Sequence, residues 1–382
     1  MGHYPFDLPR PLLPMIVFFL SFILFYSLVM MGLLSKWKIG PDTEKVAIPD
    51  FTLIVPFRNE EENFVKTLDT LRNLKVAEII FCDDHSEDRS AEIVAHYIRQ
   101  FDLPHWKLIT NSGLGKKAAI TSAVIWSRHD IIMTTDADCF LTNKGINHLV
   151  SFFRHPSIQM VCGPVTVMPG DSFLEKYQVA EWASISLVTN YFFKIKKPLM
   201  CSAANMAYRK DAFLSVDGYR HNEFVSSGDD EYLLKKIAKH FGPASIMYTC
   251  HPDAVVKTIA TADFKTYISQ RARWAGKWKA HRQAEHAGTA LLFFVIALIQ
   301  VSSVGLLGGS LINIVCFFVF WIAKIAVDQL VLGKVMEVYH KKQSILTMVS
   351  NSVFHPLSVI LIGIFSIFVK NTWKGRVVLT KA

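Results

Sequence analysis

Residues 51–60 read FTLIVPFRNE and begin with a short run of apolar and β-branched side chains that is ended by a proline. Such a run is typical of a buried strand. Two similar runs follow at 77–82 and 130–135, and the segments between them carry helical patterns at 61–74 and 90–101. Strands that alternate with helices predict an α/β fold, in which a mostly parallel sheet is covered on both faces.

Long stretches without a charged residue flank this α/β region. They lie between Arg10 and Lys36, between Glu285 and Lys324, and between Lys342 and Lys370. Each exceeds the roughly 20 residues that a helix needs to cross a bilayer. The predicted spans are 11–35, 288–307, 311–332 and 343–369.

The last of these stretches is interrupted by His355-Pro356, so one kinked span and a re-entrant pair are both compatible with it. The first is too long for a signal peptide and lacks a small-residue cleavage site, which favours an uncleaved anchor. The chain therefore divides into an N-terminal span and linker, an α/β domain, an interface helix, a membrane region and a basic tail, at 1–40, 41–262, 263–286, 287–370 and 371–382.

The net charge of +9 comes from basic residues that cluster at the predicted membrane edges. No arginine-rich or aromatic-stacking pattern typical of nucleic-acid binding accompanies them. Cationic edges favour the cytosolic side, which predicts a multi-pass protein of the cell membrane with a cytosolic domain. The basic tail argues for a cytosolic end, whereas a count of four spans places it outside. The six cysteines show no metal-type spacing, and we expect free thiols.

Acidic residues follow the predicted strands, at the edge where parallel sheets bind ligands. Asp136 and Asp138 come directly after the third strand and share a face if its geometry persists. Two carboxylates suit Mg2+ or Mn2+, which can act as a Lewis acid on a diphosphate. Asp84 follows the second strand and can hydrogen-bond a pyrimidine. Each of these patterns, taken alone, also occurs in solvated turns.

Two further motifs lie nearer the end of the domain. Gly228-Asp229-Asp230-Glu231 precedes a helix, where acids complement the helix dipole or can serve as a general base. Gln270-Arg271-Ala272-Arg273-Trp274 places an amide, planar cations and an indole on adjacent turns of a helix, which alone indicates a membrane-interface helix.

Together, and in this order from about residue 51 to 274, these motifs resemble family 2 glycosyltransferases of the membrane-bound branch. That branch includes cellulose, hyaluronan and chitin synthases, ceramide glucosyltransferase and bacterial carotenoid glycosyltransferases. The resemblance implies a GT-A fold and inverting transfer of a sugar from a UDP-sugar. The segment Cys201-Ser202-Ala203-Ala204-Asn205 departs from the family pattern, because small residues replace its glycine.

The resemblance also implies a role for each motif. Asp230 is the general base, and Asp138 binds the metal, Mg2+ or Mn2+. Gln270, Arg273 and Trp274 match a QxxRW motif that closes over the diphosphate. The remaining donor contacts are Pro56, Asp84 at the uracil, Lys116 at the nucleotide, and Asp136.

The acceptor is left open between a membrane lipid that receives one sugar and a growing glycan made by a processive synthase. The small membrane region favours the lipid. A non-catalytic scaffold is disfavoured because every motif is intact. Lys324 and Asp328 stand one turn apart within a predicted span, where ion pairs are costly; they serve either function or helix packing, and we place them outside the site. We expect Asp84, Asp138 and Asp230 to converge at the edge of one sheet, around one cation and a pyrophosphate.

Overall fold

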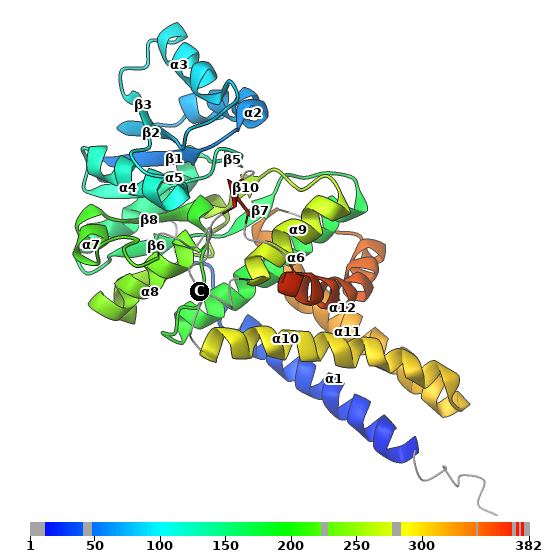
Figure 1. The fold of residues 1–382 in the computed structure, drawn as a ribbon. Coiled ribbons are helices and arrows are strands. Elements are labelled where there is room, and N and C mark those ends of the chain that lie inside the picture. The colour runs from blue at the N-terminus through cyan, green and yellow to red at the C-terminus, as the bar shows by residue number, and fades with distance from the viewer. Residues whose placement is uncertain are drawn as a thin grey trace, which may run out of the picture.

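A seven-stranded sheet, in the order β3-β2-β1-β4-β8-β6-β9, forms the centre of the domain (Figure 1). β1 to β4 pair in parallel, as do β6 and β9, whereas β8 is antiparallel to both of its neighbours. The strands are β1 (Phe51–Phe57), β2 (Glu78–Asp83), β3 (Trp106–Thr110), β4 (Ile131–Thr134), β6 (Met160–Cys162), β8 (Met206–Arg209) and β9 (Ile246–Tyr248). The prediction of an α/β fold with a mostly parallel sheet is confirmed.

The computed structural model describes residues 12–40, 48–222, 228–276, 284–340, 343–368, 372–373 and 376–377. Most of the predicted basic tail and residues 277–283 of the predicted interface helix lie outside these ranges. The domain helices are α2 (Glu61–Arg72), α3 (Ser90–Gln100), α4 (Lys116–Trp126), α5 (Asn143–Ser151), α6 (Phe173–Lys194), α7 (Lys210–Ser215), α8 (Asp229–Phe241) and α9 (Phe264–Ala275).

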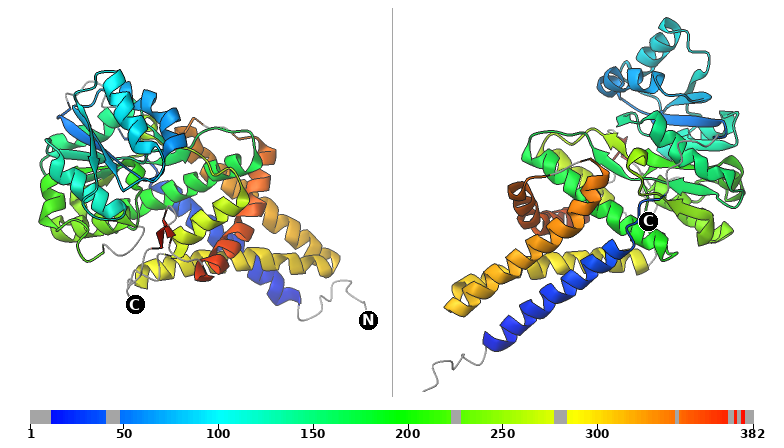
Figure 2. Two further views of the ribbon diagram at one scale, coloured as in Figure 1. Left: turned by 45° about the horizontal axis from the view of Figure 1, so that its top comes forward. Right: turned by 180° about the vertical axis from the view of Figure 1, so that it is seen from behind.

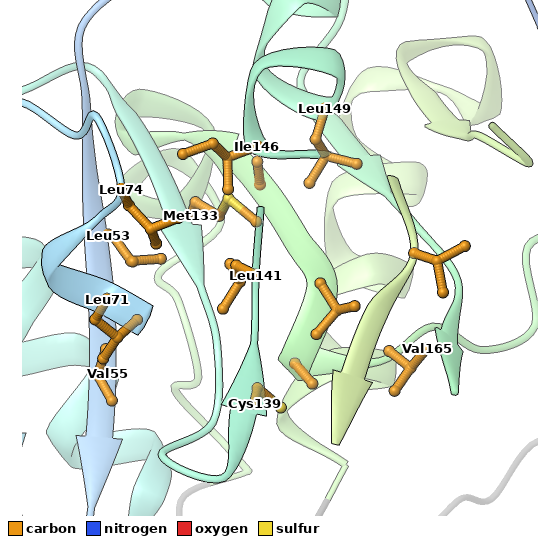
Figure 3. Packing of buried hydrophobic residues seen from close by; sticks show 14 of the residues in the cluster. Leu53, Val55, Leu71, Leu74, Met133, Cys139, Leu141, Ile146, Leu149 and Val165 are labelled. Atoms are coloured by element: carbon orange, nitrogen blue, oxygen red, sulfur yellow. The ribbon is translucent and has the colours of Figure 1, made fainter. Parts of the chain in front are cut away.

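Alternate residues of β1 supply the cores on the two faces of the sheet. Leu53 and Val55 join one buried cluster, and Ile54 joins the other, because successive side chains of a strand point to opposite faces. Figure 3 shows part of the first cluster, in which Leu53 and Val55 lie close to Leu71 of α2. Both faces of the sheet are therefore covered, as parallel sheets require.

β1 does not end at Pro56 but continues to Phe57. Its pairing with β4 stops at Ile54, and beyond that point only β2 lies beside it. Proline lacks the N–H that a ladder bond needs, but an unpaired flank tolerates it. The strand therefore delivers Pro56 to the carboxyl edge of the sheet.

β3 is a strand that the sequence pattern did not reveal. It lies at the edge of the sheet and pairs only with β2. Its residues are mostly half-buried, and Lys107 within it forms an ion pair with Glu78 of β2, with Nζ and Oε1 2.5 Å apart. A short strand that contains a charged residue does not produce the continuous apolar run that marks the buried strands.

A small sheet in the order β5-β10-β7 lies beside the main one. Its strands are β5 (Cys139–Phe140), β7 (Val165–Val167) and β10 (Val256–Thr258). Thr258 of β10 is paired with Cys139 of β5. This register brings the end of β10 next to Asp138, which directly precedes β5.

Within the part of the chain that the structure describes, four helices are long and apolar enough to cross a membrane. Of these, α1 packs along α11, and both extend away from the domain (Figure 2). α11 is longer than predicted, because its last turns leave the apolar stretch and bury Val335 and Met336 in the domain core. The helices are α1 (Leu12–Ser35), α10 (Ala284–Ser302), α11 (Leu311–Val338) and α12 (Ile345–Phe368).

α12 is one helix with Pro356 inside it, which leaves no break for a re-entrant pair of separate helices. It runs beside α9 in the same direction. The rings of Phe264 and Phe354 are 5.7 Å apart, and twelve residues later in each helix a Cβ built on Gly276 would lie 3.6 Å from the carbonyl oxygen of Ser366. α12 therefore follows the domain surface at both positions, instead of leaving it as α1 and α11 do.

Lys324 and Asp328 of α11 form a buried ion pair, with Nζ and Oδ2 2.6 Å apart. Tyr26 of α1 donates to Asp328 Oδ1 at 2.5 Å, and Ser352 of α12 donates to Asp328 Oδ2 at 2.7 Å. Lys324 also donates to the Ser352 carbonyl oxygen at 2.9 Å. The ion pair therefore connects α1, α11 and α12. Of the two roles that the sequence left open for this pair, function or helix packing, these contacts match helix packing.

We expect Asp328→Ala to destabilise the folded protein by about 3–5 kcal/mol, because it leaves the Lys324 cation buried without its carboxylate. Thermal unfolding in detergent measures this loss. The double variant Lys324→Met/Asp328→Leu removes both charges and should recover most of it. An Asp328→Ala protein as stable as the wild type would show that the pair does not hold the helices together.

Candidate active site

A cavity of about 560 Å³ lies at the carboxyl edge of the sheet and reaches the first turns of α10. Pro56, at the end of β1, lines it. Other lining residues come from segments far apart in the chain; they are Lys116, Asp136, Asp138, Asp229, Asp230, Gln270, Arg273, Trp274, Thr289, Ala290 and Phe293. All the predicted site residues except Asp84 are therefore in one cavity.

The charges at the start of α4 are arranged around Lys116. Its Nζ lies 2.6 Å from Asp136 Oδ1 and 3.4 Å from Asp229 Oδ2. Burial alone would lower the pKa of Lys116, but the charges of Asp136 and Asp229 outweigh it and raise the pKa above its ordinary value. Lys116 therefore stays protonated and links the aspartate pair after β4 to the acidic turn of α8.

Asp138 is held by the small sheet. Thr258 donates to its Oδ2 at 2.9 Å. Burial, together with the nearby charge of Asp136, raises the pKa of Asp138 to about 6. Two carboxylates whose charges repel each other are the environment that a divalent cation relieves.

The chemistry of this donor set fits a hard cation. Ligand atoms of Asp136, Asp138 and Cys139 lie within 4.8 Å of one another. Burial raises the pKa of the Cys139 thiol well above its ordinary value, and Figure 3 shows Cys139 among apolar side chains of the core. A neutral thiol is a poor ligand, so the carboxylates of Asp136 and Asp138 are the groups that would hold Mg2+ or Mn2+.

α8 begins at Asp229 because Gly228 adopts φ of 77°, a left-handed conformation that glycine accepts without strain. Asp230 lies in the first turn. Its Oδ1 accepts from the Glu231 N–H at 2.8 Å, and its Oδ2 accepts from the Ala203 N–H at 3.4 Å. The helix N-terminus thus fixes the Asp230 carboxylate at the cavity wall, facing the segment in which small residues replace the family's glycine.

Arg273 on α9 points a guanidinium at the same cavity. Burial, the largest cause, lowers its pKa, and the charge of Asp229 opposes that shift; an arginine nevertheless remains protonated. Within the described ranges, Arg273 forms no ion pair. A half-buried cation in a cavity, with no carboxylate bound to it, is suited to an anionic ligand.

Arg271, the variable position of the same motif, has a different role. It forms an ion pair with Glu181 of α6, with NH2 and Oε2 2.6 Å apart, and Nε also donates to both carboxylate oxygens. Tyr267 donates to Glu181 Oε1 at 2.8 Å. The Arg271 guanidinium lies 4.3 Å from the centroid of the Trp274 ring. Glu181 therefore anchors the helix that carries Arg273 and Trp274.

Asp84 is where the structure departs from the expected convergence. It is fully buried and does not line the cavity. Its Oδ1 accepts from Asn111 Nδ2 at 2.6 Å and from the Gly115 N–H at 2.8 Å. In this structure Asp84 holds the turn that precedes Lys116. Its predicted contact with uracil stays a prediction.

Sequence reasoning missed Glu181 and the α10 contribution to the cavity. Glu181 lies on the long helix α6, in no recognised motif, and only the fold brings it to Arg271. Thr289, Ala290 and Phe293 belong to an apolar stretch that reads as an ordinary span. The one signal that could have drawn attention to Glu181 was an acidic residue within a helix that is otherwise half-buried.

We expect Glu181→Gln to weaken UDP binding and lower the unfolding temperature, because a neutral amide leaves the buried Arg271 cation without its counter-charge. Isothermal titration and thermal unfolding measure the two effects. Glu175→Gln on the same helix is the matched control, since Gln also completes the capping box with Ser172. Equal UDP binding by both variants would contradict the anchoring role.

Comparison with known proteins identifies the fold and the family that the domain resembles. The fold resembles that of the mannosyltransferase PcManGT from Pyrobaculum calidifontis, solved in complex with GDP-Man and Mn2+, with a TM-score of 0.56 at 15% identity over 92% of this chain and 96% of that one. The fold class of the domain is therefore GT-A. Residues 52–216 match the family model described as glycosyl transferase family 2. The α/β domain therefore matches that family over these residues, and the flanking helices are consistent with its membrane-bound branch, as predicted.

The curated relatives that this chain matches are named as sugar transferases or polysaccharide synthases. The chain is 25% identical to an N-acetylglucosaminyltransferase of Rhizobium meliloti (strain 1021) over 60% of this chain and 55% of that protein. It is 24% identical to a hyaluronan synthase of Streptococcus pyogenes serotype M3 over 65% of this chain and 61% of that protein. The chain spans about half the length of the first relatives that it matches.

Proposed function

We propose that this protein is an inverting glycosyltransferase that moves a sugar from a UDP-sugar to a membrane-associated acceptor, most simply a lipid. The observation that carries the proposal is the convergence of Asp136, Asp138, Asp230 and Arg273 on one cavity whose wall includes the first turns of α10. Fixed charges of both signs in a partly dry site are what a charged donor requires.

The donor diphosphate is the ligand that these charges suit. Arg273 supplies a planar cation with no ion-pair partner among the described residues, and Lys116 supplies a second cation at the start of α4. Asp138, with Asp136, would hold Mg2+ or Mn2+, which when bound stabilises charge on the leaving diphosphate. Pro56, Gln270 and Trp274 line the same space. Asp84 supports this site from behind through Gly115 and is the expected contact for uracil.

Asp230 is the group we assign to the acceptor proton. In a single displacement, the acceptor oxygen forms a bond to the anomeric carbon as the bond to the diphosphate breaks, and the hydroxyl proton passes to a base. Asp230 lies at the cavity wall, fixed by two backbone N–H groups. Its neighbour Asp229 is already paired with Lys116, which leaves Asp230 as the carboxylate for this task.

Two observations bear on the acceptor. Thr289, Ala290 and Phe293 line the cavity and belong to a candidate membrane helix, which supports an acceptor that lies in the bilayer next to the cavity. Relatives are named poly-beta-1,6-N-acetyl-D-glucosamine synthase and hyaluronan synthase, which keeps a processive polysaccharide synthase as the second candidate. The first observation concerns this chain's own residues, and we favour a single transfer to a lipid.

The membrane arrangement is part of the proposal. With Lys36 and Lys38 after α1, the positive-inside rule places the domain in the cytosol of a multi-pass protein of the cell membrane. α1, α10 and α11 then cross, and α12 lies along α9 on the domain side. Three crossings instead of four return the basic tail to the cytosol and remove the conflict in the sequence pattern.

Purified protein in lipid nanodiscs, supplied with a radiolabelled UDP-sugar and a membrane lipid extract, tests the proposal. We expect label in the organic phase, in a product that carries one sugar. Label in a water-soluble polymer would establish the processive alternative. No transfer and no metal-dependent UDP binding would overturn the assignment of the cavity as a donor site.

A further inference from the structure

A second cavity, of about 480 Å³, lies between α10 and α12 beside the end of α9. Its lining is apolar apart from Ser366, and that hydroxyl donates to the Gly363 carbonyl oxygen of its own helix at 2.7 Å. The cavity therefore presents no free polar group among the residues that line it. A sugar, nucleotide or diphosphate would lose its hydrogen bonds there, whereas a hydrocarbon would not.

This apolar cleft adjoins the active site. Ala275, at the end of α9, and Ala290, in the first turns of α10, line both cavities. On α10, the neighbouring residues Phe293 and Phe294 face the active site and the cleft respectively. The two shared residues are alanines, so the wall between the cavities is formed in part by the smallest side chains that carry a Cβ.

The cleft depends on close packing at Gly363. A Cβ at that position would lie 2.7 Å from Phe294 Cδ2, so a larger residue would displace the Phe294 ring. The outer walls are accessible, because Leu291 of α10 and Ile367 of α12 are 62% and 57% exposed, and in the proposed membrane arrangement this side of α10 faces lipid. A molecule already dissolved in the membrane can therefore enter from the side.

We propose that the cleft between α10 and α12 binds the hydrocarbon chain of the lipid acceptor, and that the acceptor hydroxyl passes Ala275 and Ala290 to reach Asp230. The proposal rests on the proposed function and specifies its acceptor as a lipid alcohol with a long apolar chain. The cavity volume is in the range of small-molecule sites. Association with another membrane protein, and unselective contact with bulk lipid, are the competing occupants.

Photocrosslinking tests the cleft without relying on activity. The full chain in phosphatidylcholine nanodiscs is irradiated with a hexadecanol that carries a diazirine at the far end of its chain, and labelled peptides are identified by mass spectrometry. We expect label to concentrate on the cleft walls of α10 and α12. Equal labelling of the bilayer-facing side of α1 would show unselective contact and overturn the proposal.

Matched variants sharpen the test. Val359→Trp fills the cleft from α12, and Leu291→Trp narrows it from α10; each should reduce cleft labelling by about tenfold, because the indole takes the space in which several methylenes are buried. Leu361→Trp places the same side chain on α12 away from the cleft and should label as wild type. Undiminished labelling in both cleft variants would refute the site.

A second readout separates this inference from the proposed function. Hydrolysis of the UDP-sugar without acceptor reports the donor site alone, and the cleft variants should retain it while transfer to lipid falls about tenfold. Transfer that persists in both cleft variants defeats the cleft. Failure of UDP binding and hydrolysis in the wild type defeats the proposed function, whereas selective labelling would still establish a hydrocarbon site.

Discussion

Asp230→Asn is expected to reduce sugar transfer by about 100- to 10,000-fold, the usual contribution of a positioned general base. The amide has nearly the same shape, and its one oxygen can still accept the shorter hydrogen bond, from the Glu231 N–H. The longer one from the Ala203 N–H is lost, and the amide cannot take the acceptor proton. UDP binding should therefore be nearly unchanged. Initial rates with a radiolabelled donor and calorimetric titration of UDP measure the two quantities.

Asp211→Asn is the control for this variant, because Asp211 lies in the first turn of α7 and is exposed. It should transfer sugar at the wild-type rate. Turnover that survives Asp230→Asn would assign the base elsewhere, with Asp229 as the next candidate. Loss of UDP binding along with turnover would mean that Asp230 supports the donor site rather than the proton transfer.

Asp138→Ala is expected to remove the metal-dependent part of UDP binding. Carboxylates are the ligands that hard divalent cations require, and without Asp138 only Asp136, itself paired with Lys116, remains in the cluster. Titration of UDP with and without Mn2+ should show the manganese enhancement in the wild type and lose it in the variant, a change of about tenfold or more in Kd. An enhancement of equal size in both proteins would contradict the metal role.

The pH dependence of UDP binding should report the same carboxyl. The pKa of Asp138 is raised to about 6 by burial and by Asp136, and a metal binds only its ionised form. Metal-dependent UDP binding should therefore be full above pH 6 and fall as the pH drops through it.

In the metal-free protein, folding stability should depend on pH in the opposite direction. The folded state holds the Asp138 proton up to a higher pH than the unfolded chain, so the free energy of unfolding falls as pH rises from about 4 to 6.

Three of the buried strands could be predicted because their burial on both faces leaves continuous apolar runs, whereas the short buried strands β6, β8 and β9 were not predicted. β1, β2 and β4 lie within one or two residues of the predicted ranges. β3 could not be predicted, because an edge strand needs apolar residues on one face only and here pairs Lys107 with Glu78. The path of α12 along the domain could not be predicted either, because the hydropathy of a helix does not show that it contacts α9.

The site shows the same division between local and tertiary information. Motifs next to strand or helix ends, such as Asp138 after β4 and Asp230 at the start of α8, line the cavity because the end of an element determines where the side chain is delivered. Asp84 also follows a strand, yet its side chain turns to Gly115. Glu181 and the α10 wall depend on packing between distant helices, which no local pattern encodes.

A structure of the full chain with UDP and Mn2+ tests the central claim most directly. We predict anomalous scattering from manganese beside the Asp138 carboxylate, in the cavity that contains Asp230, and diphosphate oxygens within hydrogen-bond distance of the Arg273 guanidinium. Manganese and UDP bound outside that cavity, or UDP bound there with no contact to Arg273 and no metal at Asp138, would contradict it.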